Sequence, residues 1–351
     1  MFTYAQLGCF LLACLVSSAG ASAQQSPPRS EAGDGRMYLD VVVTAKSGQP
    51  VAGLQQQDFT VSDNKTLQTI TSFQAVSGRD APIAVTLVID AVNDTADNIR
   101  YERSQIDKFL RADGGNLKYP VALAVFTDKG IESVVDFSID GSAIADALQK
   151  DSIGLRDIGR TTGYWGATER VQLSLTALNQ LVASEAARPE RKVILWISPG
   201  WPLLYQPEIG LDPKLQQQTF KNIVGMSTDL LQTRVTLYSI DPIGAGESVA
   251  RAGYYKNFLK GISKPSQTQV ADLGLQVLAV QSGGLALNSG NDIAALLEEC
   301  VAETAPYYEI SFAPAPSEKA DEYHRLDVRV AKPGLMARTR QGYYTQPSPR
   351  K

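Results

Sequence analysis

The amino-acid sequence predicts an α/β fold: an open, doubly wound, mostly parallel sheet inserted in a small antiparallel β unit. Three observations lead to this prediction. Residues 83–89 form a continuous apolar run, which is typical of a central parallel strand covered on both faces. Apolar strands then alternate with helical segments as far as residue 303. Before residue 80 and after residue 306, apolar and polar residues alternate with the two-residue period of antiparallel strands.

Short strands are expected near both ends of the chain. They cover residues 38–44, 58–63, 69–73, 308–312, 325–330 and 336–339. Turn residues separate them, at 46–50, at Asn64-Lys65 and at 332–334. Neither the N-terminal nor the C-terminal set is long enough to bury a core alone. We therefore expect the two sets to pair with each other and to form one β unit.

Strands and helices alternate through the middle of the chain. The expected strands are 83–89, 121–127, 131–137, 193–197, 235–240 and 285–288, of which 131–137 is expected to be antiparallel. The expected helices are 98–111, 142–149, 167–187, 213–233, 266–281 and 293–303. This alternation is typical of a doubly wound α/β domain.

The first residues predict export rather than a folded element. Residues 2–16 are mostly apolar, and Ala21-Ser22-Ala23 follows as a small-x-small cleavage site, as in a secretory signal peptide. This run is also short for a membrane span, and no later segment is apolar enough for one. A periplasmic or secreted protein is expected. The alternative is a lipoprotein acylated at Cys14, since Leu11-Leu12-Ala13-Cys14 loosely resembles a lipobox.

These patterns divide the chain into consecutive segments. They are a signal peptide (1–23), a flexible leader (24–36), the N-terminal part of the β unit (37–79), the α/β domain (80–305), the C-terminal part of the β unit (306–346) and a tail (347–351).

Composition excludes several classes of function. The net charge of −4 provides no basic field, so we expect no nucleic-acid partner. The chain has one histidine and three cysteines, too few for a His/Cys zinc site. Cleavage would leave Cys300 as the only thiol, expected to be a small buried residue of helix 293–303. His-dependent catalysis would require His324, which lies in a charged stretch and is expected to be exposed. We therefore expect no enzyme.

Oxygen-bearing side chains follow the first central strand. Asp90 ends the apolar run, and Asn93, Asp94 and Thr95 come directly after it. The carboxyl ends of parallel strands form the ligand crevice of an open α/β sheet. Carboxylates and hydroxyls are the ligands that hard cations such as Mg²⁺ prefer. The alternative is that Asp94 or Asp97 only caps the helix that begins nearby.

Two further loops are expected at the same edge. Residues 160–166 contain Thr161 and Thr162, each a candidate hydroxyl ligand, and Trp165. Residues 198–202 follow another apolar strand and contain Trp201. Two exposed tryptophans on neighbouring loops would suit a partner-binding surface. The alternative is that both indoles fold back onto the domain.

The order of several motifs resembles the von Willebrand factor type A (VWA) domain, and more narrowly the exported bacterial VWFA-related proteins of the acidobacterial type. The resemblance covers residues 37–344. The motifs are Leu39-Asp40-Val41-Val42-Val43-Thr44, Asp58-Phe59-Thr60-Val61, Leu87-Val88-Ile89-Asp90, Arg191-Lys192-Val193-Ile194-Leu195-Trp196-Ile197-Ser198-Pro199-Gly200, Leu237-Tyr238-Ser239-Ile240-Asp241, Gly283-Gly284 and Pro306-Tyr307-Tyr308-Glu309-Ile310-Ser311-Phe312.

The resemblance implies a metal-ion-dependent adhesion site, with the motif Asp-x-Ser-x-Ser, a distant Thr and a later Asp. Asp90 matches the first position, whereas Val92 and Asp94 stand at the two Ser positions. Thr161 or Thr162 matches the Thr, and Ser198-Pro199 stands where the later Asp would fall. Val92 has no ligand atom. The implied site is degenerate, with no cofactor or with a weakly bound divalent cation, Mg²⁺ or Ca²⁺.

These observations predict an exported, non-catalytic, adhesion-type protein-binding module. The expected partner is a protein or peptide that contacts Asn93, Trp165 and Trp201, and any cation would be held by Asp90, Asp94, Thr161 and Thr162. The alternative function is a structural or assembly subunit of the cell envelope, bound through the strand edges of the β unit. The sequence does not indicate an oligomeric state.

Overall fold

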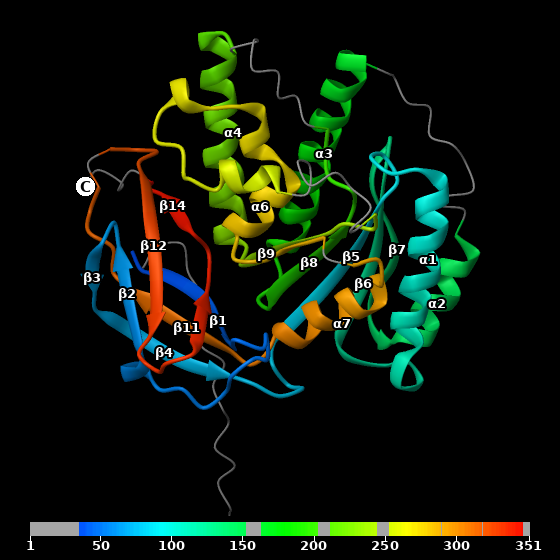
Figure 1. The fold of residues 1–351 in the computed structure, drawn as a ribbon, viewed down its shortest axis with the longest axis horizontal. Coiled ribbons are helices and arrows are strands. Elements are labelled where there is room, and N and C mark those ends of the chain that lie inside the picture. Colours follow the sequence, from blue (N-terminus) through cyan, green and yellow to red (C-terminus); the bar gives the residue numbers. More distant parts are fainter. Residues whose placement is uncertain are drawn as a thin grey trace, which may run out of the picture.

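The computed structural model describes residues 35–151, 163–202, 211–243, 253–288, 290–317 and 319–346. It has a mixed α/β fold with one six-stranded sheet and two four-stranded sheets (Figure 1). The predicted fold class is confirmed. The expected signal peptide and tail, and nearly all of the leader, lie outside the described residues. Within the described part of the chain, no helix is long and apolar enough to cross a membrane.

The six-stranded sheet forms the centre of the α/β domain. Its strands are β5 (Ile83–Asp90), β6 (Asn116–Thr127), β7 (Gly130–Asp140), β8 (Arg191–Ile197), β9 (Val235–Ile240) and β10 (Ala286–Leu287). Their order is β10-β9-β8-β5-β6-β7, and only β7, at one edge, is antiparallel to its neighbour. Every residue of β5, β8 and β9 is buried, as expected for central strands with helices on both faces.

Helices cover both faces of this sheet (Figure 1). They are α1 (Ala96–Arg111), α2 (Gly141–Lys150), α3 (Gly163–Glu185), α4 (Pro213–Gln232), α6 (Leu275–Gln281) and α7 (Ile293–Glu303). Apolar residues of α1, α2 and α7 share one core with Val85, Leu87 and Ile89 of β5. Those of α3, α4 and α6 share a second core with Val88, on the opposite face of the same strand. The two-residue alternation of the strand therefore divides the domain into two apolar layers.

The β unit consists of two four-stranded antiparallel sheets. One has the order β13-β1-β11-β4 and the other β14-β12-β2-β3. Their strands are β1 (Met37–Ala45), β2 (Phe59–Asp63), β3 (Thr66–Gln68), β4 (Ile70–Val76), β11 (Tyr307–Phe312), β12 (Tyr323–Val330), β13 (Leu335–Arg338) and β14 (Gly342–Tyr344). Both sheets contribute to a third apolar core. N-terminal strands pair with C-terminal ones, β1 with β11 and β2 with β12, as the sequence predicts.

Local structure departs from the predicted elements at three places. The expected helix 266–281 is wrong in its first part: short 3₁₀ turns precede α6, which begins only at Leu275. The backbone is extended at Gly274 (φ −65°, ψ 146°), where a Cβ atom would lie 2.8 Å from the hydroxyl of Tyr254. Strands β3 and β14 are not among the predicted strands, because three residues are too few to show a period.

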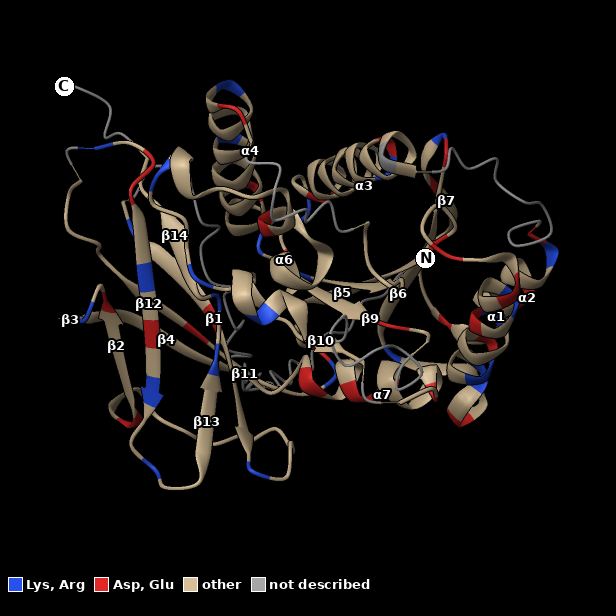
Figure 2. Cartoon of the chain, turned by 45° about the horizontal axis from the view of Figure 1, so that its top comes forward, with Lys and Arg blue, Asp and Glu red and all other residues tan. Residues whose placement is uncertain are grey.

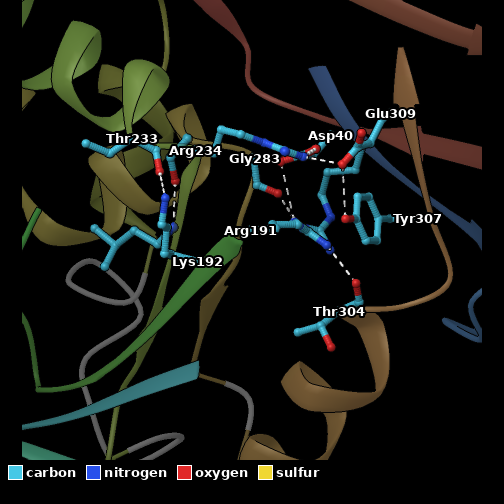
Figure 3. A network of polar contacts seen from close by, with 12 residues as sticks. Asp40, Arg191, Lys192, Thr233, Arg234, Gly283, Thr304, Tyr307 and Glu309 are labelled. Atoms are coloured by element: carbon cyan, nitrogen blue, oxygen red, sulfur yellow. Dashed lines mark hydrogen bonds and ion pairs between the residues drawn. The ribbon is translucent and has the colours of Figure 1, made fainter. Parts of the chain in front are cut away.

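A network of charges, with Arg191 fully buried and the others partly buried, joins the β unit to the α/β domain (Figure 3). We call four residues the junction network: Asp40 of β1, Arg191 of β8, Glu309 of β11, and Arg234, which directly precedes β9. Arg234 Nη2 lies 2.7 Å from Asp40 Oδ1 and 2.5 Å from Glu309 Oε1. Arg191 Nη1 donates a hydrogen bond to the carbonyl oxygen of Thr304 (2.7 Å), and its Nε lies 3.7 Å from Asp40 Oδ2. Two carboxylates of the β unit, Asp40 and Glu309, thus hold arginines of the α/β domain.

The guanidinium groups keep Asp40 ionised. Burial by itself would raise its pKa, but the charges of Arg234 and Arg191 outweigh burial and lower the pKa below its ordinary value. A lowered carboxyl pKa stabilises the folded state above the unfolded-state pKa, and this stability is lost as the pH falls through the folded-state pKa.

We expect Arg234→Met to lower the free energy of unfolding by about 3 kcal/mol, because Asp40 and Glu309 would keep buried charges without the guanidinium that they share. The matched control is Arg329→Met. Arg329 pairs with Asp327 on the exposed surface of β12, and such a pair contributes less than about 1 kcal/mol. Urea unfolding at pH 7 measures both values, and equal losses in the two variants would contradict a supporting role for the junction network.

Candidate functional site

The candidate site lies at the carboxyl end of β5. Asp90 is the last residue of this strand and is fully buried. Its Oδ1 atom accepts hydrogen bonds from the backbone N–H groups of Val92 (3.1 Å) and Asn93 (2.9 Å). An Asp side chain commonly bonds to the backbone two or three residues ahead in this way. The turn that leads to α1 is thus built around Asp90 itself.

The second oxygen of Asp90 is also occupied. Oδ2 accepts hydrogen bonds from Asn93 Nδ2 (2.9 Å), Trp196 Nε1 (3.1 Å) and Ser198 Oγ (2.9 Å). Trp196 lies in β8, next to β5, and Ser198 directly follows that strand. Burial raises the pKa of Asp90, and the hydrogen bonds from Asn93, Trp196 and Ser198 oppose this shift without cancelling it. The donors that surround this carboxylate all belong to the chain.

Asp94 and Glu102 form a second pair of buried carboxyl groups. Asp94 Oδ1 accepts hydrogen bonds from Thr95 N (2.6 Å) and Asn98 Nδ2 (2.5 Å). Asp94 Oδ2 and both oxygens of Glu102 have no conventional donor among the described residues. The neighbouring Asp94 raises the pKa of Glu102, so the protonated form of Glu102 is favoured in this pair.

Several effects keep Glu102 protonated. Burial raises its pKa well above the ordinary value, and the neighbouring carboxylates Asp94, Asp90 and Asp241 raise it further. Glu102 is 0% exposed on α1, and Asp241 follows the end of β9. We call Asp90, Asp94, Glu102 and Asp241 the acidic cluster. Two of its members are stabilised in different ways. Hydrogen-bond donors surround Asp90, whereas the raised pKa of Glu102 favours its protonated form.

The oxygens of Asp90 could meet a cation only after the chain's own donors were displaced. Five donor groups occupy the two oxygens of Asp90, and Val92 offers no ligand atom. The amide oxygen of Asn93, like Asp94 Oδ2 and both oxygens of Glu102, lacks a hydrogen-bond partner among the described residues. No group of three His, Cys, Asp or Glu side chains within the described ranges is placed to hold a metal. Thr161 and Thr162 lie outside those ranges.

The N-cap of α1 is not one of the two aspartates that the sequence analysis considers. Thr95, rather than Asp94 or Asp97, is the N-cap of α1, and its hydroxyl accepts a hydrogen bond from Asn98 N (3.2 Å). Asn93 is partly buried, and its amide donates to Ser174 of α3 (3.0 Å) as well as to Asp90. Asn93 therefore connects the turn after β5 to a helix on the far side of the site.

The two tryptophans of the predicted partner-binding surface differ in their exposure to solvent. Trp165, in the first turn of α3, is 78% exposed. Trp201 is 2% exposed, with its ring packed edge-on against Trp196 at 5.8 Å between ring centroids. Gly200 has a positive φ of 97° and donates its N–H to Ser198 Oγ (3.1 Å), which turns the chain inward before Trp201. The expectation of an exposed Trp201 is therefore wrong.

Three of the site's residues escaped the sequence analysis as interacting groups. Trp196 was assigned only to a strand, since its contact with Asp90 depends on β8 lying next to β5. Glu102 carried a readable signal, because it occupies the buried stripe of α1 with Ile99 and Ile106. Asp241 carried another, because it follows an apolar strand as Asp90 does.

The two groups considered for catalysis lie elsewhere. His324 is on β12, where its Nδ1 bonds Asp63 Oδ1 (2.8 Å) and the ring packs against Tyr343. Its expected exposure is wrong, because β12 turns the ring inward beside Asp63. Cys300 is fully buried on α7, as expected, and burial raises the pKa of its thiol well above the ordinary value.

No protein-family model and no curated protein sequence matches the chain. Solved structures are similar to parts of it. Proximal thread matrix protein 1 from the mussel byssus is 14% identical with a TM-score of 0.38, and the match covers 75% of this chain and 50% of that one. Manganese-loaded TRAP protein from Plasmodium vivax is 11% identical with a TM-score of 0.38, over 78% of this chain and 98% of that one.

A VWA domain is also among these structures. The SpRpn10 VWA domain is 13% identical with a TM-score of 0.27, over 55% of this chain and 94% of that one. This chain spans half the length of the mussel protein. At such low identities and TM-scores, these likenesses support no conclusion about metal binding or partners here, and the residues of the site have to be interpreted on their own contacts.

We expect Glu102→Gln to raise the unfolding temperature at pH 8, because a glutamine amide can donate to Asp94 Oδ2 without a proton from solvent. The folded-state pKa of Glu102 is above its unfolded-state value. The contribution of this group is therefore complete at low pH and is lost as the pH rises toward the folded-state pKa.

Thermal unfolding from pH 5 to pH 8 measures the difference between wild type and variant, which should widen with pH. The matched control is Glu299→Gln, which removes an exposed carboxylate from α7. A Glu102→Gln variant that is destabilised by the same amount at every pH would show that Glu102 is not held as a neutral acid.

Proposed function

We propose that the chain is an exported, non-catalytic protein-binding module of the adhesion type, whose metal-ion-dependent adhesion site is degenerate. The observation that carries this proposal is the closure of Asp90: both of its oxygens accept hydrogen bonds from the chain's own donors. A carboxylate satisfied in this way gains little from a cation, because a cation would first have to displace those donors. Binding by this module therefore does not require a metal.

The exposed indole of Trp165 is the proposed anchor for a protein or peptide partner. Large aromatic side chains are enriched among the residues that dominate binding energy at interfaces. Trp165 lies nine residues before Ser174 on α3, about 14 Å along the helix axis. Ser174 in turn contacts Asn93 beside Asp90. One helix thus joins the proposed anchor to the edge of the sheet where ligands of α/β domains bind.

Two features favour a non-catalytic module. His324 is engaged by Asp63 and Tyr343 in the β unit, so it is not paired with a nucleophile at the sheet edge. Cys300 of α7 is fully buried in the core. The apolar residues 2–16 and the Ala21-Ser22-Ala23 sequence favour export, to the periplasm or to the exterior.

A second candidate function rests on the strand edges of the β unit. Strand β3 is an edge strand and carries Leu67, which is 73% exposed; the edge strand β13 carries the exposed Met336. An exposed apolar residue on an unpaired edge favours addition of another strand. Charges of both signs line β12, which is separated from β3 by β2 in the same sheet (Figure 2). A scaffold or assembly subunit would use these edges rather than Trp165.

A displayed library of random peptides separates the two candidates. We expect the full chain to select peptides whose binding weakens at least tenfold in Trp165→Ala and is unchanged by EDTA. The matched control is Leu67→Ala, which removes an equally exposed apolar side chain from the β3 edge.

Peptides that are lost with Leu67→Ala and retained with Trp165→Ala would support the edge-binding scaffold and contradict the adhesion-type module. Binding that EDTA abolishes would contradict the degenerate site. Folding of each variant is checked by its far-UV and near-UV circular dichroism.

A further inference from the structure

Arg340 carries a buried guanidinium. It lies between β13 and β14 and is 7% exposed. Its Nε atom is completely buried and has no hydrogen-bond partner among the described residues. Buried arginines are ordinarily paired or hydrogen-bonded, because an unmatched charge in a poorly hydrated site is costly. This side chain therefore needs a ligand that the protein itself does not provide.

Arg340 lines a small cavity where the β unit meets the α/β domain. The cavity volume is about 30 Å³, enough for about two water molecules or one monatomic ion. Asp40 and Arg234 of the junction network line it, together with Thr236 and Ser282. Side chains from β1, β9 and the segment after α6 thus meet at one point.

The charges around this cavity do not balance. Arg191, Arg234 and Arg340 carry three positive charges, whereas Asp40 and Glu309 carry two negative ones. Both carboxylates are engaged by Arg234, and Asp40 also faces Arg191. One positive charge, that of Arg340, is left over.

Asp40 is the nearby carboxylate that acts on Arg340, but it is already engaged by Arg234 and Arg191. Burial lowers its pKa to about 10, opposed by Tyr323 and Asp40. At neutral pH the guanidinium therefore remains charged. Burial also raises the pKa of Tyr323, so its phenol is neutral at that pH and contributes no negative charge. A water molecule could satisfy the buried Nε–H, but only an anion also balances the charge.

We propose that this cavity is a binding site for a single small inorganic anion, chloride, held by the guanidinium of Arg340 at the junction of the β unit and the α/β domain. The cavity is too small for a phosphate or a carboxylate-bearing ligand to enter whole. Because the lining residues come from both parts of the molecule, the bound ion stabilises their contact. This inference does not depend on the proposed protein-binding function.

Thermal unfolding of the full chain in sodium chloride and in sodium gluconate, at equal ionic strength, tests the site. A ligand that binds only the folded state raises the ratio of folded to unfolded protein by a factor of 1 + [ligand]/Kd, about a hundredfold at a hundredfold excess. We expect a higher unfolding temperature in chloride for the wild type. Arg340→Met should lose that difference, and the control Arg329→Met, which removes an exposed arginine, should keep it.

Crystals grown in sodium bromide give a second readout that does not require a folded variant. An anomalous peak beside the guanidinium of Arg340 is expected. A wild type equally stable in both salts, a chloride effect retained in Arg340→Met, or no bromide peak in the cavity would each overturn the proposal and leave water as the partner of Arg340.

Discussion

The burial of Asp90 is the constraint on which the candidate site depends. A carboxylate withdrawn from water costs several kcal/mol unless donors surround it. Here the donors come from the turn after β5, from β8 and from the residue that follows β8. This arrangement requires β8 to lie beside β5, Trp196 to face the strand end and Ser198 to turn back toward it. The geometry of the site therefore depends on the order of the strands in the sheet.

Different parts of the chain solve the same problem of buried charge in different ways. Electrically neutral hydrogen-bond donors surround Asp90, the raised pKa of Glu102 favours its protonated form, and two guanidinium groups balance the charge of Asp40. The first two arrangements stabilise buried carboxyl groups of the acidic cluster at the sheet edge. The third fastens the β unit to the α/β domain. Arg340 is the converse case, a buried cation whose nearby carboxylate, Asp40, is already engaged by Arg234 and Arg191.

The sequence predicts the fold well and the site only in part. Apolar runs such as 83–89 and the two-residue alternation of 325–330 are local signals, and they led to the correct strands and to the pairing of the two ends. Asp90 was found because it ends such a run. The direction of Trp201 was not predictable, because it depends on the turn at Gly200 and on the ring of Trp196 from another strand. Likewise, nothing local reveals that Glu102 meets Asp94.

The substitutions at the site also fit together. Val92 stands where a hydroxyl ligand is implied, and Ser198 stands where the implied site has a carboxylate. In the structure, Val92 is part of an apolar core, and Ser198 donates to Asp90 instead of binding a cation beside it. Relative to the motif that the resemblance implies, neither position provides the expected ligand, and Ser198 instead satisfies the carboxylate of Asp90. These contacts support the proposal that binding by this module does not require a metal.

The most direct test of this claim is thermal unfolding of residues 24–351 in EDTA and then in millimolar Mg²⁺, Ca²⁺ or Mn²⁺, for the wild type and for Asp90→Ala. The closure of Asp90 by its own donors predicts the same wild-type midpoint in every solution. It also predicts a lower midpoint for Asp90→Ala even in EDTA, because buried donors lose their acceptor. A wild-type midpoint that rises with one of these ions, and a rise that Asp90→Ala abolishes, would contradict the account and establish a working metal site.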